Sequence, residues 1–141
     1  MSGGYISCGD FVGNDKSGSS MEALLRAIPA RLTPSDASSY RAQVLDPILK
    51  LLEDASDHIL IQSTVATQMY EPLKRYQEHL AATLGHPDPV QAPELDEAKG
   101  IDPIEAKYGA GLGWQFYCAT DLLQACERSQ KTGEPICFTW D

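Results

Sequence analysis

The sequence predicts a mainly α-helical protein, a bundle of four to five helices with a small two-stranded β element formed by the two ends of the chain. Three observations lead to this prediction. Apolar residues recur at helical spacing through most of the chain, proline and glycine separate these segments, and short runs of β-branched and aromatic residues lie near both termini. At 141 residues the chain has the size of one domain, 1–141, and can bury a core without disulfides or a metal.

The segment 112–131 is predicted to be the helix with the most neighbours. On a helix its apolar side chains cover an arc of roughly 200°, wider than the stripe of a surface helix. These residues are Leu112, Trp114, Phe116, Cys118, Ala119, Leu122, Leu123, Ala125 and Cys126. The opposite, polar face is predicted to hold Thr120, Asp121, Gln124, Glu127 and Arg128. We therefore expect other helices to pack on two or three sides of this segment.

Residues 1–19 are predicted to form a loop with one short strand at 5–8, because the first twenty residues contain five glycines and five serines. A helix is predicted to follow, since Ser19 and Glu22 have the spacing of a capping box. Its apolar face comprises Met21, Leu24, Leu25 and Ile28. Pro29 is expected to end this helix.

Two longer helices are each predicted to contain a proline. The first, 34–55, begins after Thr33, whose hydroxyl can cap the first turn. Its apolar stripe continues in phase past Pro47. A proline ring clashes with the carbonyl group four residues earlier in a regular helix, so we expect one helix with a kink near Asp46.

The second long helix, 67–84, contains Pro72 and is expected to stop at Gly85. Residues 58–65 before it are rich in isoleucine, valine and threonine, which suits a strand as well as a helix. The internal prolines have two interpretations: simple curvature of the helices around the core, or a functional hinge.

The C-terminal part predicts a helix interrupted by glycines and then a strand. A helix start is expected at Pro103, but the three glycines between 109 and 113 weaken a helix by ~3 kcal/mol, so we expect a bend or break among them. Gly133 is expected to end the last helix. The segment 134–141 is rich in isoleucine, phenylalanine, threonine and tryptophan, which predicts a strand, and its candidate partners are 5–8 and 58–65.

The net charge of −9 comes from 20 acidic and 11 basic side chains. Residues 86–105 hold six acids against Lys99 alone, and so carry five of the nine excess negative charges. Three prolines in 86–101 predict an irregular surface loop. The acids expected to bind a partner are Asp88, Glu94, Asp96, Glu97 and Asp102. Nucleic-acid phosphates need clustered lysine and arginine, so we expect a basic protein partner and no nucleic acid.

The sequence nominates no catalytic residue, no metal site and no cofactor. The four cysteines are irregularly spaced, and no histidine pair has the spacing of a helical metal site. A nucleophile elbow GxSxG is also missing. The glycine tract reads GxGxG, which is neither the dinucleotide fingerprint nor a phosphate loop.

Function follows from these exclusions and from the charge. No run approaches the ~20 apolar residues of a membrane span, and the N-terminus is unlike a signal peptide, so we expect a cytoplasmic protein without membrane contact. The hypothesis is a non-enzymatic protein-interaction module, of the inhibitor or immunity type, that binds and neutralises a basic enzyme or toxin. The alternative is a small enzyme or ligand-binding domain with a pocket beside Gly109–Gly113, lined by Tyr108, Trp114 and Tyr117.

Overall fold

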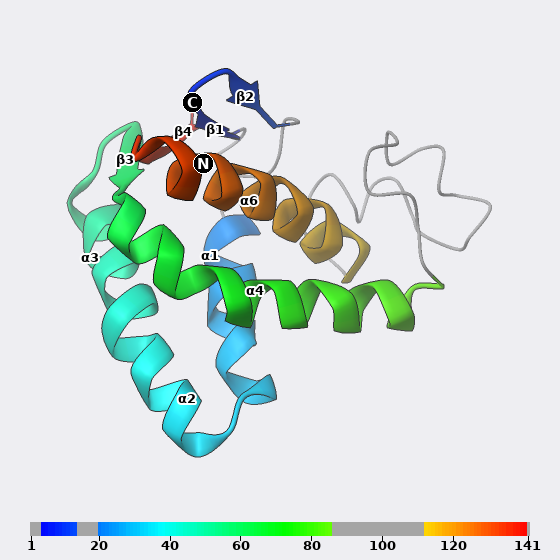
Figure 1. The fold of residues 1–141 in the computed structure, drawn as a ribbon. Coiled ribbons are helices and arrows are strands. Elements are labelled where there is room, and N and C mark those ends of the chain that lie inside the picture. Colours follow the sequence, from blue (N-terminus) through cyan, green and yellow to red (C-terminus); the bar gives the residue numbers. More distant parts are fainter. Residues whose placement is uncertain (1–3, 14–19, 86–111, 141) are drawn as a thin grey trace.

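The structure is a computed structural model that describes residues 4–13, 20–85 and 112–140, and Figure 1 shows how their helices and strands are arranged. Helices make up about 70% of these residues, which confirms the mainly α prediction. The predicted loop 86–101, the helix start at Pro103 and the glycines at 109 and 111 lie outside the described residues.

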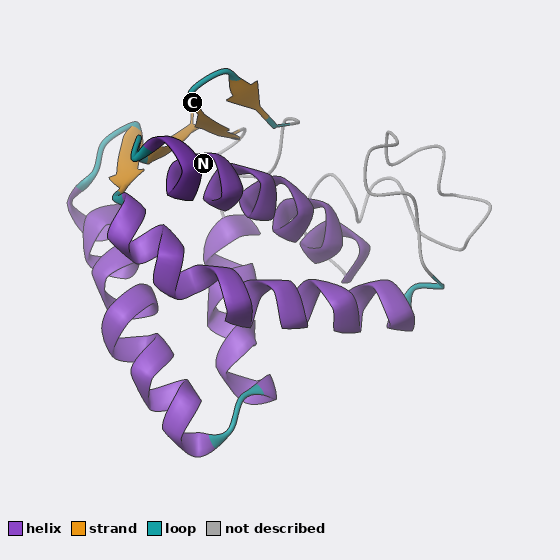
Figure 2. Cartoon of the chain, viewed as in Figure 1, coloured by secondary structure: helices purple, strands orange, loops and turns teal. Residues whose placement is uncertain are grey.

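The helical segments pack in a bundle in which α4 and α6 lie side by side (Figures 1 and 2). In chain order they are α1 (Ser20–Ala27), the 3₁₀ segment η1 (Ile28–Arg31), α2 (Pro34–Tyr40), the π-helical segment η2 (Arg41–Leu45), α3 (Asp46–Asp54), α4 (Ser63–Thr83) and α6 (Leu112–Thr132). Helix α1 packs against α6 from another side. In the described ranges, no helix combines the length and the apolar character needed to cross a membrane.

Caps and glycines set the helix ends where the sequence predicts them. The hydroxyl of Thr33 accepts a hydrogen bond from the backbone N–H of Asp36 at 3.2 Å, which caps α2. Gly85 and Gly133 follow α4 and α6, and both have φ +78°. This left-handed conformation suits glycine, so the chain leaves both helices at these positions.

The two internal prolines are accommodated in different ways. Residues 34–54 form one continuous helical run, and its irregularity is the π-helical turn η2 directly before Pro47. There the N–H of Asp46 bonds to the carbonyl of Arg41, five residues back, so the predicted kink near Asp46 is a change of helical period. Helix α4 keeps its α-helical assignment through Pro72 and changes direction about midway along its length in Figure 1.

The β element is a four-stranded antiparallel sheet, so the prediction of two strands is wrong in its extent. As expected, strands from the two ends of the chain pair, β1 (Gly4–Cys8) with β4 (Ile136–Trp140). A turn at Gly9, with φ +60°, adds β2 (Phe11–Val12), and β3 (His58–Ile61) pairs with the other edge of β4. The sheet order is β2-β1-β4-β3. Strand β3 supplies hydrogen-bond partners for the backbone groups on the second edge of β4.

The sheet has one packed face and one open face. Side chains alternate along each strand, and the packed face comprises Ile6, Cys8, Ile59, Ile61, Ile136, Phe138 and Trp140, all buried. Residues 58–65 were compatible with strand or helix, and the structure assigns the first four to β3 and begins α4 at Ser63. Buried and exposed residues alternate along β3, which is the period of a strand and not of a helix.

Helix α6 is enclosed even more completely than its wide apolar arc predicts. The positions from Phe116 to Leu122 are all buried. Thr120 and Asp121 were assigned to an exposed polar face, and this is wrong, because they are 7% and 6% exposed. The N-terminal strands come close on that side: a Cβ atom at Gly13 would lie 2.6 Å from Asp121 Oδ2. The Thr120 hydroxyl donates to the carbonyl of Phe116 at 2.9 Å, which satisfies it inside the bundle.

Candidate functional site

Two surface grooves in the described part of the chain are compared as candidate binding sites. The first, called the apolar groove, lies between α3, β3 and the first turn of α4. Its lining residues are Pro47, Ile48, Lys50, Leu51, Asp54, Leu60, Ile61, Gln62 and Val65. Its volume of about 410 Å³ falls within the range of about 300–1,000 Å³ found for ligand pockets.

Local sequence periodicity builds the walls of the apolar groove. Pro47, Leu51 and Asp54 follow one another at spacings of four and three residues, so they share one side of α3. Leu60 occupies an exposed position of β3, and the chain turns at Gln62 into α4. Leu51 and Leu60 are 41% and 43% exposed, and these large aliphatic surfaces meet in the groove. Apolar area that stays in contact with water in this way favours a partner that covers it.

The segment 46–61, which supplies most of the lining of the apolar groove, is rich in acids and is called the acidic rim; of its charged residues, Lys50 and Asp54 line the groove itself. Between Asp46 and Ile61 the chain carries four acids against one base, Lys50, which gives a net charge of −3 with histidine neutral. The acids, all exposed, are Asp46, Glu53, Asp54 and Asp57. Asp57 Oδ1 lies 2.7 Å from Nδ1 of His58, which orients the imidazole at the start of β3. The site therefore offers apolar contact with negative potential around it.

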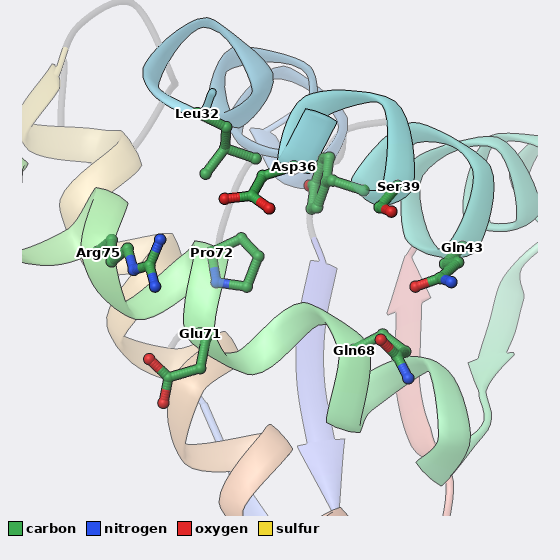
Figure 3. Close-up of a pocket in the computed structure, with 9 residues that line it drawn as sticks. Leu32, Asp36, Ser39, Gln43, Gln68, Glu71, Pro72 and Arg75 are labelled. Carbon is green, nitrogen blue, oxygen red and sulfur yellow. The ribbon is translucent and has the colours of Figure 1, made fainter. Parts of the chain in front are cut away.

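The second groove, called the polar groove, runs between α2 with η2 on one side and α4 on the other. Figure 3 shows Asp36 and Ser39 projecting from α2, and Gln68, Glu71 and Arg75 projecting from α4. The other lining residues are Leu32, Tyr40, Gln43 and Pro72. Its volume is about 200 Å³, below the usual range of ligand pockets.

The floor and walls of the polar groove differ in rigidity. The hydroxyl of Tyr40 donates to the carbonyl of Leu25 at 3.0 Å, and burial raises the pKa of this phenol well above its usual value. The charged side chains Asp36, Glu71 and Arg75 are exposed and form no ion pair with any described residue. Their heads are therefore solvated, so a ligand at this groove exchanges hydrogen bonds with water for hydrogen bonds with protein.

The polar groove also bears on the hinge interpretation of the prolines. Gln43 belongs to η2, and Pro72 interrupts the backbone hydrogen bonds of α4. A proline has no N–H, so the carbonyl of Gln68, four residues earlier, loses its helical donor. Both irregular turns line this one groove. The hinge interpretation remains a prediction.

The residues that the sequence nominates for partner binding lie elsewhere. Asp88, Glu94, Asp96, Glu97 and Asp102 are all outside the described residues.

The alternative pocket beside Gly109–Gly113 is only partly described. Tyr108 and the side chain of Trp114 lie outside the described part. Tyr117 is 6% exposed and packs edge-on against Phe116, with ring centroids 5.3 Å apart. Its hydroxyl is buried without a hydrogen-bond partner among the described residues. The aromatic ring is therefore part of the core, and only its hydroxyl is left to interact with a ligand.

The described side chains show no arrangement for metal or thiolate chemistry. No group of three or more histidine, cysteine or acidic residues within the described ranges is placed to hold a metal ion. Burial is the main cause that raises the pKa of the Cys8 thiol, and it raises the pKa of Cys126 to about 12. A nucleophilic cysteine needs a lowered pKa, so both thiols have the opposite electrostatic setting.

The chain matches no protein-family model, no curated protein and no solved structure in comparisons with each. The candidate site therefore stands on its own geometry. The sequence gives little sign of the acids beside the apolar groove, because residues 21–85 as a whole carry eight acids and six bases, which nearly cancel. The acids of the rim fall within sixteen of those residues, and a shorter window would have found them.

Proposed function

We propose that this protein is a non-enzymatic protein-interaction module that binds a basic partner at the apolar groove. The observation that supports the proposal is the meeting of two exposed leucines, Leu51 and Leu60, in a groove that Asp54 also lines and whose main segment, 46–61, has a net charge of −3. Fully burying a leucine side chain contributes about 1.5–3 kcal/mol, so covering the exposed two-fifths of both contributes roughly 2 kcal/mol. That is the scale of an interface hot spot.

The charge of the chain supports a cationic partner. Of the net charge of −9, the acidic rim accounts for −3 and the segment 86–105 for −5. A negative potential of this kind raises the rate at which a basic surface is encountered, and the increase shrinks as salt is added. We propose a basic enzyme or toxin in the cytoplasm as the partner class, with this protein acting as its inhibitor by covering a cationic surface.

A pair of matched peptides tests the proposal. One fluorescent probe contains four Lys-Val repeats, and the control contains four Glu-Val repeats with the same apolar pattern. Fluorescence anisotropy at low salt should show saturable binding of the lysine peptide and a Kd at least tenfold weaker for the glutamate peptide, a difference of about 1.4 kcal/mol.

Equal affinity for both peptides, or no binding of either at millimolar protein, contradicts the proposal. A third probe with four Lys-Ser repeats tests whether positive charge alone explains the binding. This probe keeps the positive charge but has no apolar side chains to fill the groove, so it should bind at least fivefold more weakly than the Lys-Val peptide.

The acids of the segment 86–105 have their own test. Reversing Glu94, Asp96 and Glu97 to lysine should slow association with the Lys-Val peptide at low salt and leave the thermal midpoint nearly unchanged. Stopped-flow kinetics at two salt concentrations measures this. An unaltered association rate removes this segment from the binding surface and leaves the apolar groove as the proposed site.

A second candidate function is binding of a small ligand at the start of α6. The hydroxyl of Tyr117, which is buried without a hydrogen-bond partner among the described residues, favours it, because an unsatisfied polar group costs about 1–3 kcal/mol that a ligand can recover. A thermal-shift screen of nucleotides and phosphorylated metabolites tests it, since a ligand at 100 times its Kd adds about 2.7 kcal/mol of stability. A shift that persists in Tyr117→Phe places the ligand elsewhere.

A further inference from the structure

The edge of β3 that faces away from β4 carries unused backbone groups. In an antiparallel pair, alternate residues direct both N–H and C=O toward the partner strand. The N–H of Trp140 bonds to the carbonyl of Asp57 at 2.9 Å, in register with the pairing of Ile59 with Phe138. Asp57, Ile59 and Ile61 therefore face β4. The N–H and C=O groups of His58 and Leu60 face the opposite way.

This edge opens beside the apolar groove. Strand β3 is the last in the sheet order, and its residues Leu60 and Ile61 line the groove together with α3. In the described part of the chain, no backbone hydrogen bond joins His58 or Leu60 to another segment on that side. An exposed strand edge next to an apolar groove is the arrangement that accepts an extended peptide as an added strand.

Charge decides which segment can occupy the edge. A second copy of this chain would bring a second acidic rim of net −3 against the first, and like charges across an interface are unfavourable. The chain's own segment 86–105 carries a net −5 and is repelled for the same reason. A segment of another protein with alternating apolar and basic residues satisfies both the leucines and the rim.

We infer that the partner binds as a fifth strand, with an extended apolar and basic segment hydrogen-bonded to the backbone of His58 and Leu60. This inference rests on the proposed function and specifies its geometry. Alternate side chains of the added strand enter the groove against Leu51 and Val65. The other side chains continue the open face of the sheet beside His58 and Leu60, where the aliphatic stems of lysine side chains can cover Leu60.

Backbone amide exchange, followed by NMR on the full chain with and without the Lys-Val peptide, tests the inference. The amides of Ile59 and Ile61 bond to β4 and should be protected in both samples, which makes them internal controls. The amides of His58 and Leu60 should exchange fast in the free protein and at least tenfold more slowly in the complex. A peptide that binds without slowing these two amides overturns strand addition.

Methylated peptides make the test independent of the protein's own dynamics. Two Lys-Val peptides carry N-methyl groups on alternate backbone nitrogens, one on the even set and one on the odd set. An added strand presents only one set to β3, so one isomer should lose at least tenfold in affinity while the other stays within about twofold. Equal affinities contradict strand addition and leave the proposed function standing. If the unmethylated Lys-Val peptide does not bind, strand addition and the proposed function are both contradicted.

Discussion

The apolar groove and the polar groove are both built around a proline inside a helix, yet they offer a partner different free energies. At the apolar groove, covering Leu51 and Leu60 releases water from apolar surface at about 25 cal/mol per Å². At the polar groove, a ligand of Asp36, Glu71 or Arg75 replaces bonds to water, and each exchange nets only about 0.5–1.5 kcal/mol. The comparison teaches that volume and side-chain chemistry together, rather than the presence of a helical irregularity, identify the stronger site.

The largest expected effect comes from removing the leucines of the apolar groove. The double variant Leu51→Ser, Leu60→Thr should bind the Lys-Val peptide about 30-fold more weakly, a loss of about 2 kcal/mol, because the apolar contact is gone. Its urea midpoint should also fall, because the buried three-fifths of the two side chains contribute roughly 2–4 kcal/mol to folding, so the affinity is compared under conditions where circular dichroism shows both proteins folded. Fluorescence anisotropy measures the affinity.

The matched control for this variant is Val12→Thr, because Val12 is 64% exposed on β2, at the far edge of the sheet from β3. This control should bind like the unmodified protein. Equal losses in the control and in the leucine variant would show that the peptide recognises apolar surface in general.

Charge reversal at the two grooves gives the next largest effect. Glu53→Lys with Asp54→Lys should slow association of the Lys-Val peptide about tenfold at low salt, and the difference should shrink at high salt. The matched pair Asp36→Lys with Glu71→Lys changes the same charge at the polar groove and should slow association by no more than about twofold. Stopped-flow fluorescence measures both. Equal slowing by both pairs would mean that only net charge matters.

Replacing each proline by alanine compares how much the two prolines destabilise the helices beside the two grooves. Pro72→Ala should raise the free energy of unfolding by about 1 kcal/mol, because it restores a helical N–H donor to the Gln68 carbonyl. Pro47→Ala should change it by less than about 0.5 kcal/mol, because the π-helical turn η2 already accommodates that proline. Urea denaturation measures both values. A larger gain in the free energy of unfolding for Pro47→Ala than for Pro72→Ala would contradict the interpretation that η2 accommodates Pro47.

Alkaline pH gives the smallest effect and concerns the polar groove alone. Burial raises the pKa of Tyr40 above that of an unfolded tyrosine, about 10, so the folded state keeps the phenol protonated. The stability from this group is complete only well below pH 10 and falls as the pH rises through the pKa of the unfolded tyrosine, by about 0.7 kcal/mol between pH 9.5 and 10.5. Tyr40→Phe should be less stable overall and lose this part of the slope. An unchanged slope in urea titrations would show that the phenol ionises in the folded state.

The sequence predicts the helical part of this fold well because its signals are local. The cap at Thr33, the glycines Gly85 and Gly133 and the wide apolar arc of α6 each act within a few residues. Asp121 is buried beside Gly13, more than a hundred residues away, and Thr120 accepts a hydrogen bond from Gln77 of α4, so helical periodicity predicts the wrong side for both. Tertiary packing overrode a pattern that was locally correct.

The sheet and the candidate site depend on pairing across the chain. β3 has only four residues, and its role follows from the edge that β4 leaves open, which no local pattern encodes. The apolar groove needs α3 and β3 to meet, so Leu51 and Leu60 could not be connected from the sequence. The partner acids from Asp88 to Asp102 were chosen from charge alone and remain a prediction, since they lie outside the described residues.

The most direct test of the central claim, that the groove between α3 and β3 is the docking site, is an NMR titration of isotopically labelled protein with the Lys-Val peptide. The amide signals of Leu51, Leu60 and Val65 should shift in proportion to peptide bound, and those of Gln68 and Arg75 in the polar groove should stay in place. Saturable shifts at the polar groove, with Leu51 and Leu60 unchanged, would contradict the claim.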